Sequence, residues 1–193
     1  MKINELRTRI HLMLAGVCLL ALVVASGPGF AAKNGEDDLS LPKNFRTSMT
    51  HLGSWFVPEG DASGFHDVYM TTSSVDAYRR TGKFPEGTKL VKELRPSEAG
   101  TYTTGSNVSH ATDGIKQWFV MVKDGNGSGK GPNYGDGWGW ALYKPDDPDQ
   151  NVSPGYKDDI AQGGCISCHI PARQTDYVYV EAYPTLRKTA LGR

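Results

Sequence analysis

The sequence predicts an α+β domain built on a mostly antiparallel β-sheet with a few short helices. Several short segments are rich in β-branched and aromatic residues and are bounded by turn-forming residues, which is typical of strands. Few segments combine an apolar helical pattern with residues that start and end helices. The strands do not alternate with long helices, so a parallel sheet is not favoured, and the chain has no internal repeat.

Four segments are predicted to be strands of this sheet. They are FHDVYMTT (65–72), TKLVKELRP (88–96), IKQWFVMVKD (115–124) and WGWALYKP (138–145). The segment DYVYVEAYP (176–184) is expected to close the domain as a last strand or extended segment.

Helices are predicted in three short stretches. The segment 41–57 is expected to begin with a short helix or turn that leads into an apolar stretch. The segment 73–84 has Ser73 and Ser74 as possible caps, and Gly82 can end the helix. A third helix, roughly 155–168, is expected to carry the cysteine motif described below.

The Gly-rich segment GNGSGKGPNYGDG (125–137) is predicted to be a flexible hairpin loop. It lacks the spacing and the Ser or Thr of a phosphate-binding loop. Asp124, Asn126 and Ser128 match the start of a calcium-binding loop, but Gly135 stands where the bidentate glutamate belongs.

The first 32 residues are predicted to be a cleaved secretory signal peptide. Lys2, Arg7 and Arg9 precede the apolar run 12–25, and small residues follow it. The run is shorter than the roughly 20 residues of a membrane span, and an uncleaved anchor is the alternative. After cleavage we expect no membrane span. Residues 33–193 would form one periplasmic domain that begins with a loose polar segment.

The charge balance argues against nucleic acid as a partner. The chain has 21 Lys and Arg and 21 Asp and Glu residues, and the predicted leader contains three basic residues and one acidic residue. The remaining domain has a net charge of −2. It therefore lacks the basic excess that binds nucleic acid or an anionic membrane.

The segment GGCISCH (163–169) holds the most specific motif of the chain. C-x-x-C-H is the signature of covalent haem attachment, so we predict one haem c per chain, held by Cys165 and Cys168, with His169 as iron ligand. A disulfide in an oxidising compartment is one alternative. Thiol–disulfide exchange would place the motif early in a βαβ unit, and structural zinc needs further ligands; the sequence favours neither.

The sixth iron position is predicted to be open or to bind a residue upstream of the motif. Residues 170–193 contain neither Met nor His. An open position suits ligand binding or catalysis, whereas a second protein ligand suits electron transfer. Core packing is the alternative role of each methionine. The candidate ligands are Met49, Met70, Met121, His51, His66 and His110.

Lys92 has an unusual place in the predicted strand 88–96. Side chains two residues apart share one face of a strand, so Lys92 lies on the same face as Leu90 and Leu94. In one interpretation this is an edge strand and the lysine amine reaches water. In the other, the amine points into the haem pocket.

The chain resembles the cytochrome P-460 family of ammonia- and methane-oxidising bacteria and its sister group, the β-type cytochromes c-prime. The resemblance implies a mostly antiparallel sheet, a homodimer, C-terminal haem c attachment and oxidation of hydroxylamine, alone or with nitric oxide. Lys92 matches the lysine that cross-links to the haem in cytochromes P-460, and His169 matches the proximal ligand. The similar segments are LPKNFR (41–46), FHDVY (65–69), DAYRRTGKFPEGTKLVKEL (76–94), GWGWALYKPDDP (137–148) and GGCISCHIPARQTDYVYVEAYPTLR (163–187).

Two positions depart from the cytochrome P-460 pattern. His66 stands where an arginine is expected, and Phe119 stands where a distal carboxylate accepts a proton from bound hydroxylamine. His66 and Asp113 are therefore the candidate proton acceptors, because both side chains titrate. Phe119 and Met121 are candidate residues of the haem pocket. An apolar residue there is similar to the distal cap of β-type cytochromes c-prime, which bind nitric oxide or carbon monoxide without the cross-link.

We expect an exported mono-haem enzyme that oxidises hydroxylamine and passes electrons to a soluble cytochrome. One alternative is a protein that binds nitric oxide or carbon monoxide without turnover. The other is an electron carrier whose sixth iron position is closed by an upstream Met or His.

Overall fold

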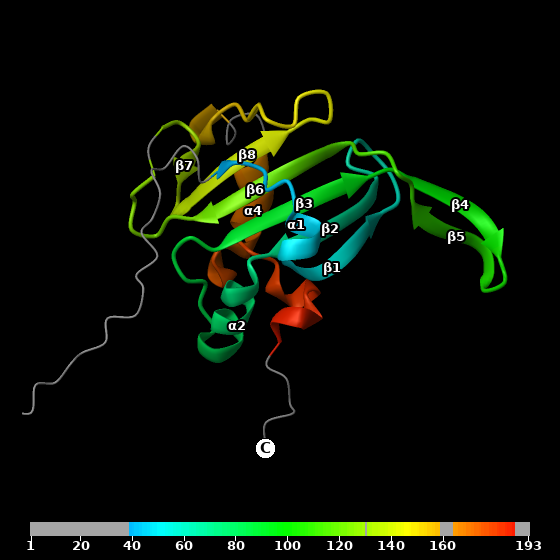
Figure 1. Cartoon of the computed structure of the whole chain (residues 1–193), viewed down its shortest axis with the longest axis horizontal. Coiled ribbons are helices and arrows are strands. Elements are labelled where there is room, and N and C mark those ends of the chain that lie inside the picture. Colours follow the sequence, from blue (N-terminus) through cyan, green and yellow to red (C-terminus); the bar gives the residue numbers. More distant parts are fainter. Residues whose placement is uncertain (1–38, 130, 159–163, 188–193) are drawn as a thin grey trace, which may run out of the picture. The chain divides into compact units, whose positions relative to one another are not determined.

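A six-stranded antiparallel sheet is the central element of the chain (Figure 1). The structure is a computed structural model that describes residues 39–129, 131–158 and 164–187, which all fall within the unit Ala32–Arg193. The predicted signal peptide and most of the polar segment after it lie outside the described residues. The sheet order is β1-β2-β3-β6-β8-β7, with β1 Thr50–Val57, β2 Gly64–Met70, β3 Lys89–Arg95, β6 Gln117–Lys123, β7 Tyr134–Gly135 and β8 Trp138–Tyr143.

The described helices are short and accompany a mostly antiparallel sheet, and this combination confirms the predicted α+β class. None of them has the length and apolar character needed to cross a membrane. The four predicted strands correspond to β2, β3, β6 and β8, and the Gly-rich segment connects β6 to β8. The helices are α1 Phe45–Ser48, α2 Thr72–Thr81, α4 Cys165–His169, and the 3-10 helices η2 Ile170–Thr175, η3 Val180–Ala182 and η4 Pro184–Leu186.

Helix α2 ends as predicted but begins differently. Gly82 ends it with a left-handed backbone, at φ 72°. The helix begins after Thr71, so neither Ser73 nor Ser74 is its N-cap. Ser74 is buried instead, and its hydroxyl accepts a hydrogen bond of 3.0 Å from the hydroxyl of Thr88.

The C-terminal segment 176–184 is not a strand, contrary to the prediction. Asp176 and Tyr177 both have left-handed backbones, at φ 58° and 63°, which no regular strand accommodates. The apolar residues of this segment, such as Val178 and Tyr183, pack against the sheet without pairing with it. Buried and exposed residues alternate in these 3-10 turns much as they do in a strand, so the sequence pattern alone does not distinguish the two structures.

The predicted helix 155–168 is also not continuous in the described residues. Residues 156–158 are helical and 159–163 lie outside the described part. Gly164 has a non-helical backbone, at φ −80° and ψ −146°, and α4 begins only after it.

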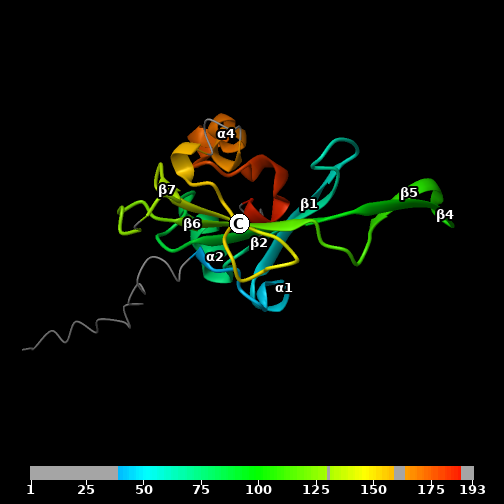
Figure 2. The same ribbon diagram turned by 90° about the horizontal axis from the view of Figure 1, so that it is seen from above.

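Four strands were not predicted. One of them, the two-residue β7, lies within the Gly-rich segment that was predicted to be a loop. The segment 41–57 divides into α1 and the strand β1. The other two strands, β4 Ser97–Tyr102 and β5 Gly105–Ala111, form a separate hairpin that projects away from the main sheet (Figures 1 and 2). The hairpin strands are mostly exposed, so they lack the apolar alternation that reveals a half-buried strand.

The main sheet buries side chains on both faces. Helix α4 and the C-terminal turns lie over one face, and α1 lies over the other (Figure 2). Neighbouring residues of β3 and β6 therefore point into different cores. The first core includes Met70, Leu90, Met121, Trp140 and Ile166, and the second includes Phe45, Val91, Val120 and Tyr143.

Candidate functional site

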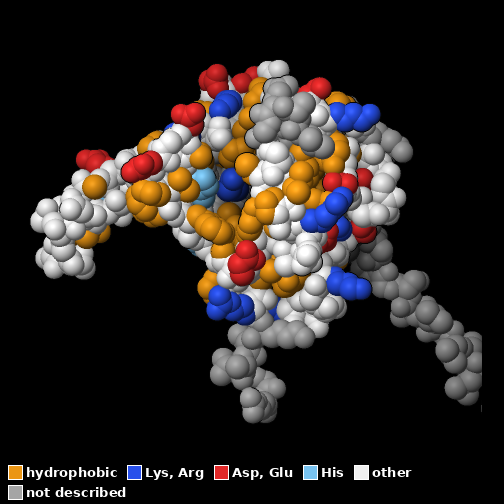
Figure 3. All heavy atoms as spheres, turned by 180° about the vertical axis from the view of Figure 1, so that it is seen from behind, with side chains coloured by type: hydrophobic (Ala, Val, Ile, Leu, Met, Phe, Trp, Pro, Cys, Tyr) orange, Lys and Arg blue, Asp and Glu red, His pale blue; other side chains and the backbone are white. Residues whose placement is uncertain are grey.

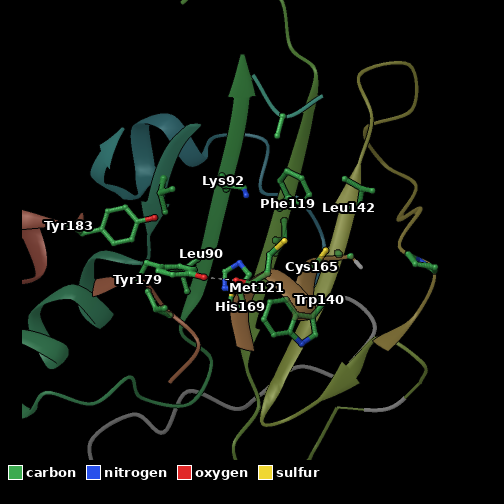
Figure 4. Close-up of a pocket in the computed structure, with 18 residues that line it drawn as sticks. Leu90, Lys92, Phe119, Met121, Trp140, Leu142, Cys165, His169, Tyr179 and Tyr183 are labelled. Carbon is green, nitrogen blue, oxygen red and sulfur yellow. Dashed lines mark hydrogen bonds between the residues drawn. The ribbon is translucent and has the colours of Figure 1, made fainter. Parts of the chain in front are cut away.

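A cavity of about 450 Å³ opens on the sheet face that α4 covers. Figure 3 looks onto this face, where hydrophobic side chains border a hollow that contains basic and histidine side chains. The strands contribute Leu90, Phe119, Met121, Trp140 and Leu142 to its wall (Figure 4). A predominantly apolar cavity with a few polar groups is the usual form of a ligand or cofactor site.

The cysteine motif faces this cavity from α4. Cys165, Cys168 and His169 all line it. Residues three and four apart lie on one side of a helix, so a single short helix presents both sulfurs and the imidazole together. Ile166, which is 0% exposed, anchors the opposite side of the helix in the core. Cys165 and Cys168 form no disulfide in the structure.

The imidazole of His169 is held in a defined orientation. Its Nδ1 lies 2.6 Å from the carbonyl oxygen of Tyr177. Because a carbonyl only accepts, Nδ1 carries the proton and the lone pair resides on Nε2, the form that binds metals. The rings of Trp140 and Tyr179 contact the imidazole edge-on, with centroids at 5.2 and 5.9 Å.

Lys92 lies inside the sheet and points into the same cavity (Figure 4). β3 is an internal strand, so the edge-strand interpretation of this lysine is wrong. Lys92 pairs across the sheet with Val68 and Phe119, and its Nζ lies 4.3 Å from the centre of the Phe119 ring.

Burial lowers the pKa of Lys92 and so favours the uncharged, nucleophilic amine. The thiols of Cys165 and Cys168 oppose this shift. Thioethers carry no charge, so this opposition would disappear if the two sulfurs held a haem.

The structure brings together some of the predicted distal residues. Phe119 and Met121 both line the cavity, from the same face of β6. Of the six candidate sixth ligands, Met121 alone lines it. Met70 is buried in the core beside the cavity, Met49 packs against the other core, and His110 contacts Tyr102 on the β4–β5 hairpin. The remaining candidates are His51, which pairs with Asp67, and His66.

The two candidate proton acceptors lie outside the cavity wall. His66 is half-buried on β2, and its Nε2 lies 2.7 Å from the carbonyl oxygen of Ala62, which does line the cavity. Burial, followed by the charges of Lys92 and Lys116, lowers the pKa of His66 against the opposing effect of the Ala62 hydrogen bond. The Asp113 carboxylate is fully exposed and lies 3.8 Å from Nη2 of Arg95. The prediction that Asp113 accepts a proton in the pocket is therefore wrong, because this residue lies on the surface.

Sequence reasoning missed four large side chains of the cavity. Trp140 and Leu142 follow from the alternation of β8, because they share a face with the buried Trp138. Tyr179 and Tyr183 come from the C-terminal segment, whose strand-like alternation predicted a different backbone from the 3-10 turns that place these rings in the wall. The Tyr183 hydroxyl accepts a hydrogen bond of 3.1 Å from Nε1 of Trp55, and burial raises the pKa of Tyr183 to about 12.

These residues fit a covalently attached haem. The cavity volume is in the range of roughly 300–1,000 Å³ that is usual for cofactor sites, and most of the wall is apolar. Two thiols with the C-x-x-C spacing and an oriented imidazole form its α4 side. Lys92 is the one Lys or Arg among the described residues of the wall.

Comparison with known proteins agrees with this site. The family model of cytochrome P460 matches residues 42–180, which include the main sheet, Lys92 and the cysteine motif. A search of the curated proteins finds no match. The match confirms the family predicted from the sequence, and the family implies a haem cofactor. This chain therefore belongs to the cytochrome P460 family.

Proposed function

We propose that this protein is an exported mono-haem c-type cytochrome that oxidises hydroxylamine, alone or together with nitric oxide. The observation that carries the proposal is the placement of the Lys92 amine in the cavity lined by Cys165, Cys168 and His169. A desolvated lysine beside a haem-attachment motif matches the lysine that cytochromes P-460 link to their haem.

Each of these residues has a distinct role. Cys165 and Cys168 would hold one haem through thioethers, and His169 would bind its iron through Nε2. Lys92 would be linked covalently to the macrocycle. When bound, the haem would supply a redox-active iron that can accept electrons from hydroxylamine.

Proton removal from hydroxylamine needs an acceptor near the cavity. None of the described residues of the wall is a carboxylate. We assign this role to His66, because its lowered pKa keeps the ring uncharged near neutral pH. Ala62, to which it is hydrogen-bonded, belongs to the wall.

A second candidate function is reversible binding of nitric oxide or carbon monoxide without turnover. The apolar wall favours it, since Phe119, Leu90 and Leu142 offer a bound ligand no hydrogen bond. A third candidate, electron transfer, would require Met121 to close the sixth iron position, because Met121 is the candidate ligand in the wall.

The proposed setting is the periplasm, with the signal peptide removed. Electrons would leave to a soluble cytochrome, and the protein would act as a homodimer, as the family resemblance implies.

The test is turnover by the haem-containing protein with hydroxylamine and oxidised cytochrome c as electron acceptor. The proposal predicts hydroxylamine-dependent reduction of the acceptor by the wild type and its loss in Lys92→Leu. Equal, background-level rates in both would reject the enzyme. Carbon monoxide titration of the ferrous protein then decides between the alternatives, because only a protein with a closed sixth position resists the ligand.

A further inference from the structure

The turn that follows η2 contains two consecutive residues in an unfavourable conformation. Asp176 and Tyr177 have φ values of 58° and 63°, and neither is a glycine. Left-handed backbones are disfavoured for residues with a Cβ, and they persist where surrounding contacts enforce them. The second of these residues provides the carbonyl oxygen that accepts the hydrogen bond from Nδ1 of His169, at 2.6 Å.

The side chain of Asp176 is held by two donors from the sheet. Its Oδ1 lies 2.7 Å from Nζ of Lys123 and 3.2 Å from Nε1 of Trp138. Lys123 and Trp138 are partners across β6 and β8, so the two donors come from a rigid pair of strands. Trp138 is 0% exposed, and the Lys123 side chain is only 14% exposed.

The side chain of Tyr177 is fixed independently. Its hydroxyl donates to Oδ2 of Asp136 at 2.9 Å and accepts a hydrogen bond of 2.9 Å from Nε of Arg173. Tyr177 is buried. The two residues that lead into the Tyr177–Val178 peptide are therefore both anchored by their side chains, and the carbonyl of that peptide, which belongs to Tyr177, points toward His169.

We propose that Asp176 is a positioning residue for the haem iron. Clamped by Lys123 and Trp138, it holds the strained turn that presents the Tyr177 carbonyl to His169. This inference rests on the proposed role of His169 as iron ligand, and it does not depend on hydroxylamine oxidation. A hydrogen bond to Nδ1 makes the imidazole a stronger electron donor to the iron. Releasing the clamp weakens that bond, raises the reduction potential and softens the iron–histidine bond.

The test measures the iron–histidine vibration of the ferrous protein by resonance Raman spectroscopy, together with the reduction potential. Asp176→Ala and Lys123→Met should each shift the vibration to lower frequency and the potential upward. Asp176→Asn should stay near the wild type, because Asn retains an acceptor oxygen and tolerates the left-handed backbone. If Asp176→Ala does not fold, the Lys123→Met and Asp176→Asn pair decides the question.

Arg46→Met is the matched control. It removes an ion pair on the opposite face of the sheet, between Arg46 and Glu93, and should leave the vibration and the potential unchanged. Wild-type values in Asp176→Ala and Lys123→Met, or equal shifts in Arg46→Met, would overturn the clamp. An unchanged vibration in His169→Ala would reject His169 as ligand, and the clamp with it, which is a separate failure.

Discussion

Lys92 and Glu93 are neighbours on β3 and lie on opposite faces of the sheet. The charge of Glu93 has hydrogen-bonding partners, whereas that of Lys92 has none among the described residues. Glu93 is 1% exposed and accepts hydrogen bonds from Nε and Nη2 of Arg46 and from Nε1 of Trp118, the last at 2.8 Å. Lys92 faces the cavity, and its Nζ makes no hydrogen bond or ion pair with the described residues.

The difference separates a structural charge from the charge to which we assign a function. A buried charge with several good partners is part of the packing, although it adds little net stability. A buried amine without a counter-charge is unfavourable for folding, so it indicates a role that stability does not explain. One strand therefore carries a structural residue and a residue of the candidate site at adjacent positions.

The largest expected effect comes from breaking the Glu93 network. Arg46→Met leaves the Glu93 carboxylate buried with only the Trp118 donor among the partners described above. We expect a loss of about 3 kcal/mol in the free energy of unfolding, at the low end of the usual range because half of the Arg46 side chain is exposed. Urea denaturation measures it. Lys43→Met, which breaks an exposed pair with Asp149, is the control and should leave the midpoint in place.

The opposite result is expected for Lys92→Leu. Replacing a desolvated amine by an apolar side chain of similar size should change the free energy of unfolding by less than about 1 kcal/mol, or raise it. The same urea experiment tests this. A loss as large as that of Arg46→Met would mean that Lys92 is a structural residue like Glu93.

A smaller effect concerns the pH dependence of stability through His66, which shares the cavity face. Burial lowers its pKa below the ordinary value of 6.5, so the unfolded chain binds the proton more readily. This contribution to stability is complete above about pH 6.5 and is lost as the pH falls toward the lowered folded pKa. His66→Gln should remove this slope from urea midpoints measured between about pH 5 and 7. An unchanged slope would contradict the burial of the ring.

The smallest effect is expected for Asp113→Asn. The side chain is fully exposed and pairs loosely with Arg95. Denaturation midpoint, carbon monoxide affinity and hydroxylamine turnover should all match the wild type. A tenfold loss of turnover would contradict this result. It would mean that the loop carrying Asp113 moves and brings its carboxylate to the cavity.

The sequence predicted the parts of the site that follow from local spacing. C-x-x-C-H has a fixed helical geometry, and period-two alternation placed Lys92 with Leu90, so both were found before the fold was known. The cavity wall formed by Tyr179 and Tyr183 was missed because two left-handed residues convert a strand-like pattern into turns. The β4–β5 hairpin was missed because its strands bury little on either face.

Asp113 and His66 show where prediction of site residues from the sequence fails. Both were named because their side chains titrate and could replace the distal carboxylate that Phe119 does not provide. The loop between β5 and β6 directs Asp113 to solvent, and the β1–β2 loop brings Ala62 to the cavity while His66 binds its carbonyl. These positions depend on loop paths, which the apolar pattern does not encode.

The measurement that tests the functional role of Lys92 most directly is the absorption spectrum of the ferrous protein, matured in a host that attaches haem c. A covalent link from Lys92 predicts a long-wavelength band in the wild type that is absent from Lys92→Leu, whose spectrum should be that of an ordinary haem c. If the two spectra are the same ordinary haem c spectrum, Lys92 does not modify the haem, and nitric oxide binding or electron transfer becomes the function that the cavity best supports.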